Sequence, residues 1–520
     1  MPRSPISFLD RRRFLATSTA WAAATIWAGR ANGLTLKNPP LGGYPFTLGI
    51  ASGDPTPDGF VLWTRLAPKP LEGGGMPHTN VSVEWVVAED EKLSKIVQQD
   101  TATATPEWGH SVHVEVAGLK PDHWYFYQFR VGSELSPVGR TRTMPLREST
   151  PEKLKFAFAS CQHFESGLYT AYEHMLHDDL DLVVHLGDYI YEGAGKITGV
   201  RKHVGPLLKT LDNYRNRHAQ YKTDAALQAM HAAAPWLVTW DDHEFENNYA
   251  NNISQHKDAV VEDFLKQRAV AYQAYYENMP LRRSSLPRGA DMILYRTSSF
   301  GRLAEFQVLD TRQYRSDQPC GDGRKAPCAE SLAETQTILG AEQEAWLCKQ
   351  LKASPATWNV LAQQVMVGRV DRVAGPAEGY SMDQWPGYEA NRQRLIKYLY
   401  EQKIANPVIL TGDIHVNFAN NIELAGPGDK QIPVATELVG TSISSGGNGL
   451  REPKGHTETL AENPFVKFFN SERGYVRCTV TPREWKSDYQ VLDYVVKPGS
   501  PIHTRASFVT EAGKPELQHA

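Results

Sequence analysis

Leu180-Asp181-Leu182-Val183-Val184-His185-Leu186 is a nearly continuous apolar run, and Gly187-Asp188-Tyr189-Ile190-Tyr191-Glu192 follows it directly. Apolar runs of this length are typical of strands that are buried on both faces of a sheet. Ligands of such sheets bind beyond the strand ends, which is where the Gly-Asp pair stands. A Gly-Asp pair is also common in plain turns, so this stretch needs support from the rest of the chain.

Three further apolar runs end in polar clusters of the same kind. They are Lys155–Ser160 before Cys161-Gln162-His163, Trp236–Trp240 before Asp241-Asp242-His243-Glu244, and Pro407–Thr411 before Gly412-Asp413-Ile414-His415. Taken singly, each cluster is explained by a turn, a helix N-cap or a small buried thiol. Four clusters in order, each closing an apolar run, favour one ligand site at a shared sheet edge instead.

The chain divides into segments of different pattern. Strand-like runs alternate with helical stretches over residues 152–500, which predicts an α/β catalytic domain with a sheet covered on both faces. Residues 42–146 read as short alternating strands, and the turn before Trp124–Val131 resembles the tyrosine corner of a fibronectin-III or immunoglobulin-like sandwich. We expect a flexible loop at 441–449 and a weakly held tail at 501–520.

Composition and charge narrow the class of protein. The chain has 520 residues, of which 41% are hydrophobic and 22% charged, as in ordinary globular proteins. The net charge of −4 offers no electrostatic surface for a nucleic-acid backbone, although a nucleotide substrate remains compatible. No apolar stretch is long enough to span a membrane, so we expect no stable membrane anchor.

The N-terminal residues 1–31 have the pattern of an export signal. Arg11-Arg12-Arg13-Phe14-Leu15 precedes a mild apolar run, Ala16–Trp27, which ends among small residues. Paired arginines before Phe-Leu resemble a twin-arginine signal, which predicts export by the Tat translocase to the periplasm or the outside of a bacterium. The alternative is a basic amphipathic N-terminus of a cytosolic protein.

Five cysteines are compatible with an oxidising compartment. Cys320 and Cys328 flank a Gly-Asp-Gly turn, a spacing that closes a small disulfide loop easily. Cys348 and Cys478 could form a second pair, which the sequence does not establish. Under that pairing Cys161 is left over, at the end of an apolar run.

The residue types in the four clusters suit phosphate-ester hydrolysis. That reaction needs an activated water, neutralised phosphoryl oxygens and a proton for the leaving group, and two metal ions supply the first two. Asp188 is our choice for the carboxylate that bridges the ions, with Tyr191 turning back from the same loop as a ligand. Thiolate and phenolate are anionic donors that favour a strongly Lewis-acidic ion such as Fe³⁺. His243 suits the role of general acid.

These motifs resemble those of the calcineurin-like metallophosphoesterases, including the purple acid phosphatases. In that superfamily Gly-Asp-x-x-Tyr and Gly-Asn-His-Glu supply metal ligands and a catalytic His. This sequence departs from the pattern in having Cys161 for an Asp, Asp242 for an Asn, and Asp413 for the first His of Gly-His-x-His. With Trp240–Glu244 and Leu309–Arg315, the departures resemble the alkaline phosphatase D (PhoD-type) family, whose members have a twin-arginine signal, an N-terminal β-sandwich and a four-layer αββα catalytic domain.

The resemblance implies a ligand set. Cys161, Asp188, Tyr191 and His415 would hold Fe³⁺, while Asp188, Asp242 and Asp413 would hold the second metal position. Because carboxylates replace nitrogen donors there, we expect one or more Ca²⁺, with a second iron or Zn²⁺ as the competing assignment. Further oxygen ligands are sought among Asn247, Asn248, Gln363 and Gln364. Arg312 is expected either to clamp the substrate phosphate or to form a surface ion pair.

We expect a secreted phosphomonoesterase that also hydrolyses phosphodiesters, with His243 as general acid. Its role would be to scavenge phosphate. Its substrates would be small phosphate esters. An alternative within the same chemistry is a dedicated phosphodiesterase or a phospholipase D-like enzyme that acts on phospholipid head groups or nucleotides. A non-catalytic adhesin built on the β-sandwich is a third possibility, and it leaves the strand-end clusters unexplained.

Overall fold

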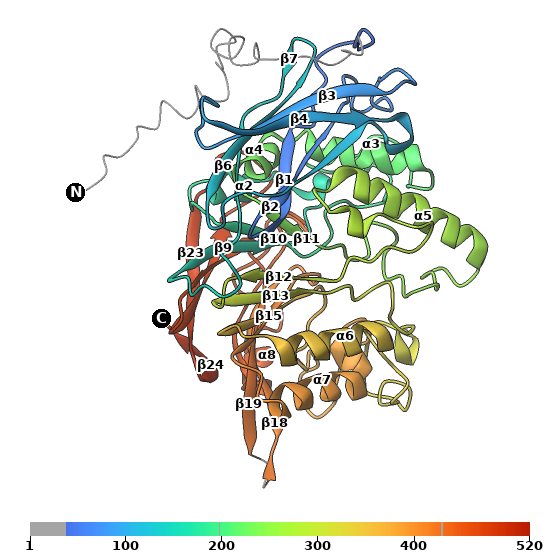
Figure 1. Ribbon diagram of the computed structural model, residues 1–520. Coiled ribbons are helices and arrows are strands. Elements are labelled where there is room, and N and C mark those ends of the chain that lie inside the picture. The colour runs from blue at the N-terminus through green and yellow to red at the C-terminus, as the bar shows by residue number, and fades with distance from the viewer. Residues whose placement is uncertain (1–37, 197, 428–429) are drawn as a thin grey trace.

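Two large mixed sheets form the centre of the molecule (Figure 1). The computed structural model describes residues 38–196, 198–427 and 430–520, so the expected export signal lies outside the described residues. The first sheet has ten strands, in the order β24 (Lys514–His519), β23 (Ile502–Glu511), β22 (Glu484–Leu492), β21 (Arg473–Val480), β9 (Leu154–Ala159), β10 (Leu182–His185), β11 (Trp236–Val238), β1 (Ile50–Thr56), β2 (Gly59–Arg65) and β5 (Ser111–Val116).

The second sheet has seven strands. Their order is β12 (Arg296–Phe300), β13 (Ala304–Val308), β15 (Trp358–Ala362), β17 (Pro407–Thr411), β19 (Gln431–Val439), β18 (Asn417–Ala425) and β20 (Val466–Asn470). The strands β9, β10 and β11 run parallel to one another, and so do β13, β15, β17 and β19. Every apolar run that the sequence indicated as a strand of the catalytic domain forms one of these parallel strands.

Alternation along the strands builds two cores. On β9, Phe156 and Phe158 enter a cluster between the two sheets, together with Phe306 and Val360 from the facing sheet. Ala157, one residue away, points into a separate cluster on the other face. This period of two is what a strand with two buried faces requires.

Helices cover the outer faces of both sheets. The helices α2 (Thr170–Met175), α3 (Leu211–Lys222), α4 (Ala225–Ala233) and α5 (Val261–Asn278) supply residues such as Tyr172, Tyr214 and Met230 to the cluster on the ten-stranded sheet. The helices α6 (Gly340–Ala353) and α7 (Glu389–Glu401) lie beyond the seven-stranded sheet, with the short α8 (His456–Glu462) nearby (Figure 1). The helices cover the faces of the sheets and do not cover the polar ends of the strands.

The N-terminal region is rich in strands and is joined to the large sheet. The strands β4 (Ile96–Ala104), β3 (Val81–Ala88), β6 (Trp124–Val131), β7 (Glu134–Leu135) and β8 (Gly139–Arg142) form a sheet of their own. The strands β1, β2 and β5 instead extend the ten-stranded sheet, where Gly53 pairs with Trp236 of β11. Gly53 is needed there because a Cβ would come 2.5 Å from the carbonyl oxygen of Pro280.

The expectation of a weakly held tail at 501–520 is wrong. Residues of this segment form β23 and β24 at the edge of the ten-stranded sheet, and Phe508 and Leu517 are buried in the core between the sheets. The strand pattern was hard to recognise because an edge strand keeps one face polar, so few of its residues are apolar.

One disulfide is present among the described residues, between Cys320 and Cys328, as the sequence predicted. Cys348 on α6 and Cys478 on β21 are free thiols, so the second pair that the sequence left open does not form. Cys161 is free and buried. The disulfide loop also carries β14 (Arg324–Lys325), which pairs with β16 (Tyr380–Ser381).

Candidate metal centre

The ends of β9, β10, β11 and β17 bring the four polar clusters together. Suitable ligand atoms lie within 4.8 Å of one another in three groups, which are Cys161 with Asp188 and His415, Asp188 with Asp242 and His243, and Asp241 with Asp242 and Asp413. Asp188 belongs to two of the groups and therefore lies between the two sides of the site. All six predicted metal ligands come together, because Tyr191 contacts both Asp188 and His415.

Four of these residues hold a left-handed backbone conformation. The φ angles are +58° for Cys161, +57° for Asp188, +63° for Asp413 and +57° for His415. Residues other than glycine adopt this region at some energetic cost, and such residues gather at functional sites. Here the sharp turn after each strand directs the side chain into the space between the strand ends.

Tyr191 lies at the iron side of the predicted centre. Its hydroxyl donates to Asp188 Oδ2 at 2.8 Å and lies 3.0 Å from His415 Nε2. Ser445 Oγ lies 2.7 Å from the same hydroxyl and 2.7 Å from the carbonyl oxygen of Cys161, and its single proton is donated to one of them. The segment 441–449 was expected to be a flexible loop, but Thr441–Ser445 is buried against the site because its serines supply these hydrogen bonds.

His243 lies beside Tyr191 and is held by a residue that the sequence did not single out. Its Nδ1 is 2.7 Å from Glu192 Oε2, and Glu192 Oε1 accepts from the Asn247 amide at 3.1 Å. Burial alone would lower the pKa of His243, but the charges of Asp242 and Glu192 outweigh burial and raise that pKa. Its position directly after Tyr191 in the motif was the available signal for Glu192.

A second unforeseen residue, Arg217 of α3, fixes the loop that carries Tyr191. Its Nη1 donates to the carbonyl oxygens of Tyr191 and Gly193, and the side chain is buried. Nothing in a helical sequence marks such an arginine, because its role follows from how α3 packs on the sheet.

Arg312 has surroundings that do not fit a substrate clamp. It is 0% exposed, and its guanidinium donates to Asp241 at 2.5 Å, to both oxygens of Asp383 at 2.9 and 3.0 Å, and to Asp413 at 3.3 Å. Full burial fits neither the expected phosphate clamp nor the alternative of a surface ion pair, because the ion pairs of Arg312 lie inside the protein. Arg312 balances carboxylates behind the site, and its charge holds the pKa of Asp242 below the usual range despite burial.

The donors present fit metal ions. Four carboxylates, Asp188, Asp241, Asp242 and Asp413, lie together, and one oxygen each of Asp188, Asp241 and Asp242 is buried without a hydrogen bond. Buried acceptors of this kind are destabilising unless a cation or a donor satisfies them. Burial and the charge of Asp188 raise the pKa of both Cys161 and Tyr191, so a cation is needed to make thiolate and phenolate ligands of them.

The hydrogen bonds of the four amide side chains narrow the choice of additional oxygen ligands. Gln364 Oε1 accepts from both the amide and the hydroxyl of Thr311, and Gln363 Oε1 accepts from Trp385 Nε1, so both glutamines serve the scaffold. Asn247 Nδ2 donates to Gln255. The backbone N–H of Asn248 donates to Asp242 Oδ2 at 2.7 Å, which places Asn248 next to the predicted second metal position.

A fourth group of potential ligands, His163, Glu165 and His203, is already hydrogen-bonded. His203 contacts the carbonyl oxygen of Gly193 and the hydroxyl of Tyr221, and His163 Nδ1 contacts Ser166 Oγ at 2.7 Å. These contacts join the loop after Tyr191 to the 3-10 turn at Phe164–Ser166. We assign this group to the scaffold.

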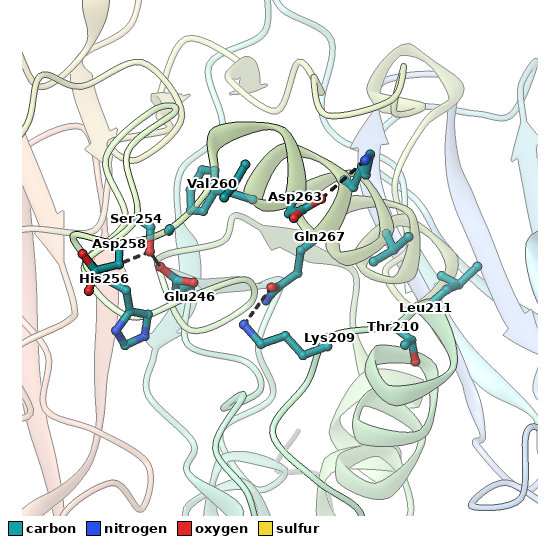
Figure 2. A pocket seen from close by; sticks show the side chains of 14 residues that line it. Lys209, Thr210, Leu211, Glu246, Ser254, His256, Asp258, Val260, Asp263 and Gln267 are labelled. Atoms are coloured by element: carbon teal, nitrogen blue, oxygen red, sulfur yellow. Dashed lines mark hydrogen bonds and ion pairs between the residues drawn. The ribbon is translucent and has the colours of Figure 1, made fainter.

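A cavity of about 720 Å³ lies between α3, α5 and the loop that follows Asn248 (Figure 2). Apolar residues such as Leu211 and Val260 line it, together with Lys209 and Glu246. Ser254 donates to Glu246, and Lys209 donates to Gln267 at 3.0 Å, as the dashed lines in Figure 2 show. The cavity contains none of the predicted site residues.

No described helix is long and apolar enough to cross a membrane.

Family models for the PhoD-like phosphatase match residues 156–489 and, for its N-terminal domain, residues 33–145. Alkaline phosphatase D of Bacillus subtilis (strain 168) is 51% identical over 98% of this chain and 89% of its own length. A solved structure of PhoD matches with a TM-score of 0.90 and 53% identity, covering 93% of each chain. The chain therefore belongs to the PhoD-like phosphatase family, and it is a metal-dependent phosphoric ester hydrolase whose substrates are small phosphate esters.

Proposed function

We propose that this phosphatase hydrolyses phosphomonoesters and also phosphodiesters at the strand-end centre, with Fe³⁺ on one side of Asp188 and Ca²⁺ on the other. The observation that carries the proposal is the division of donors around Asp188. Cys161, Tyr191 and His415 lie on one side, and Asp242 and Asp413 on the other. Buried carboxylates this close together are destabilising unless cations neutralise them, which supports bound metal ions.

The choice of metals follows from the donor types. Thiolate, phenolate and imidazole together favour a strongly Lewis-acidic ion, which supports Fe³⁺. The second position offers carboxylate oxygens alone, which suits Ca²⁺ better than Zn²⁺. When bound, the ions supply charge neutralisation and lower the pKa of a nearby water.

The protein residues have distinct roles in this proposal. His243, which lies beside Tyr191 and is held by Glu192, delivers a proton to the oxygen of the leaving group. Glu192 fixes the imidazole by its hydrogen bond to Nδ1. Arg312 keeps Asp241 and Asp413 in place and does not touch the substrate.

We also propose that the enzyme is exported through the Tat translocase to the periplasm or the medium, where it scavenges phosphate. The Arg11-Arg12 pair and the disulfide, which suits an oxidising compartment, support this. Changing both arginines to Lys should leave the precursor in the cytoplasm, as cell fractionation would reveal. Normal export of that variant would rule out a twin-arginine signal.

The finer domain assignment is likewise our proposal. Residues 152–520, with β23 and β24 included, would form a four-layer αββα domain, because helices lie on the outer face of each of the two packed sheets. Residues 42–146 would form the immunoglobulin-like module. The Lys120 amide donates to the Tyr125 hydroxyl at 3.0 Å, a contact that resembles a tyrosine corner.

The proposed function is tested by following hydrolysis and the visible spectrum together. Active enzyme should hydrolyse p-nitrophenyl phosphate and, at a different rate, its bis ester, and should carry a charge-transfer band from Fe³⁺ bound to phenolate or thiolate. A Ca²⁺-selective chelator should abolish hydrolysis while the band persists, and added Ca²⁺ should restore the rate. Stoichiometric Zn²⁺ in active enzyme, with no response to Ca²⁺ removal, would contradict the calcium assignment.

Cys161→Ala provides the matching variant on the iron side. It should lose iron and the band, and most of the activity, while far-ultraviolet circular dichroism stays unchanged. Cys348→Ala, which removes a half-buried thiol on α6, is the control and should keep both.

A further inference from the structure

The disulfide loop reaches the second metal position. Cys320 and Cys328 close a ring of nine residues, and Asp322 within this ring accepts from Asn248 Nδ2 at 3.0 Å. The backbone N–H of Asn248 in turn donates to Asp242 Oδ2 at 2.7 Å. Two hydrogen bonds thus connect the disulfide ring to a predicted metal ligand.

The same segment holds Asn248 from a second direction. Gln318, two residues before Cys320, donates through Nε2 to the carbonyl oxygen of Asn248 at 2.8 Å and to Asp383 Oδ1 at 2.7 Å. Both oxygens of Asp383 accept from Arg312, which also contacts Asp413. The segment 318–322 is therefore linked to both carboxylates of the second metal position, Asp242 and Asp413.

The ring has a backbone that needs an external constraint. Cys320, Gly321, Asp322 and Gly323 all have positive φ angles, of 57°, 74°, 61° and 75°. A short polar loop in this conformation has many alternatives of similar energy, and a cross-link removes them. The carbonyl oxygen of Gly323 is fixed from the other side by the Met382 amide, at 2.9 Å.

We propose that Asp322, held by the Cys320–Cys328 disulfide, is a positioning residue for the second metal position. It holds residue 248 in place through the Nδ2 group of Asn248, and the backbone N–H of Asn248 fixes the Asp242 carboxylate. The inference rests on the proposed function, because it deepens the assignment of Asp242 to the calcium side. Asp322 Oδ1 is buried without a hydrogen bond, so a rotation of this carboxylate is not resisted by a second partner and depends on the ring.

The test is the Ca²⁺ concentration that gives half-maximal hydrolysis of p-nitrophenyl phosphate, measured with the iron charge-transfer band in the same samples. Removing a residue that orients a metal ligand typically weakens metal binding 10–100-fold, so Asp322→Ala should raise this concentration about tenfold or more and leave the band unchanged. Asp322→Asn should behave like the wild type, because an amide oxygen can accept the same hydrogen bond. Cys320→Ser with Cys328→Ser should raise the concentration in the same direction as Asp322→Ala.

Asp317→Ala is the matched control, since Asp317 is an exposed acid just outside the ring whose carboxylate accepts from the backbone N–H of Gln318. It should leave the half-activating concentration unchanged. Serine variants replace chemical reduction because a thiol reductant would also act on Fe³⁺.

Three results would overturn the positioning role. They are an unchanged Ca²⁺ requirement in Asp322→Ala, an equal defect in Asp322→Asn, and loss of the iron band together with the Ca²⁺ response. A wild-type enzyme whose rate does not depend on Ca²⁺ would instead contradict the proposed metal assignment. The Ca²⁺ dependence of the wild type is therefore measured first.

Discussion

His243 shows how single residues gain their role from their neighbours. Its Nδ1 is held by Glu192 and its ring lies 4.1 Å from the Tyr191 ring, measured between centroids. A protonated imidazole fixed in this way suits proton delivery to the leaving group, a step that contributes about 10²–10⁴-fold to rates. The motif predicted His243, but the hydrogen bond to Glu192 became visible only in the folded chain.

We predict that the loss of rate caused by His243→Ala depends on the leaving group of the ester. Esters of poorly acidic alcohols should slow by about 10²-fold or more, because their leaving oxygen needs the proton. Esters of p-nitrophenol should slow much less. The measurement is kcat for a series of phosphate monoesters of graded alcohol acidity, and a uniform loss across the series would assign His243 to binding or metal retention.

The predicted metal ligands that the fold brings together share one property of the sequence. Cys161, Asp188, Asp242 and Asp413 each follow directly on an apolar strand, so strand order alone brings them together. Arg312 also follows a strand, but its partners Asp383 and Asp413 come from elsewhere in the chain. Because side-chain partners across two sheets depend on packing, a local pattern could not separate a clamp from a buried ion pair.

At the scale of elements, α3 ends in a buried lysine, Lys222. The Lys222 ammonium lies 4.3 Å from the centre of the Trp63 ring and 5.2 Å from that of Tyr189. Burial lowers the pKa of Lys222 from 10.5 to about 7. The folded protein therefore disfavours the charged form, while the unfolded chain keeps its ordinary pKa.

This difference sets the sign of a pH effect on stability. Between pH 7 and pH 10.5 the unfolded state binds more protons than the folded state, so the free energy of unfolding rises with pH through this window. Lys222→Met removes the effect, and its stability relative to the wild type should be about 3 kcal/mol greater at pH 6 than at pH 9. Urea unfolding of both proteins at the two pH values measures this. A relative stability that does not change with pH would show that Lys222 is neutral throughout or reaches solvent.

Elements at the edges were the least predictable part of the fold. In the strands β23 and β24 most residues are polar, and Phe508 and Leu517 are buried in the core between the sheets, with the partly buried Ala506 packed against it. The loop at 441–449 has a sequence rich in Ser and Gly, which usually indicates flexibility. Both are ordered by partners distant in sequence, and such partners cannot be recognised from local composition.

At the scale of the whole molecule, the ten-stranded sheet joins three parts of the chain. The N-terminal strands β1, β2 and β5 stand on one side of β9–β11, and β21–β24 stand on the other. The predicted boundaries near residues 146 and 500 therefore separate patterns of sequence within one continuous sheet. The site lies at the ends of its central strands, so both flanks support it.

Truncation after residue 500 tests this view of the C-terminal flank. It would remove β23 and β24 and expose the edge of β22 and the apolar cluster around Trp485 and Phe468. We expect a markedly lower midpoint of thermal unfolding and aggregation of the truncated protein, because an exposed edge strand pairs with other chains. A truncated protein with the thermal stability of the full chain would favour the original expectation of a weak tail.

The central claim is that Asp188 joins two metal positions in one catalytic centre, and Asp188→Asn tests it most directly. The measurement is the rate of p-nitrophenyl phosphate hydrolysis by this variant, with Asp179→Asn as control, an exposed aspartate that also has a positive φ. Asn keeps the shape of Asp188 but removes the charge that both ions share. We predict a loss of about a thousandfold, equal to about 4 kcal/mol of transition-state stabilisation, and a control rate like that of the wild type. An Asp188→Asn enzyme that retains the wild-type rate would contradict the assignment of this cluster as the catalytic centre.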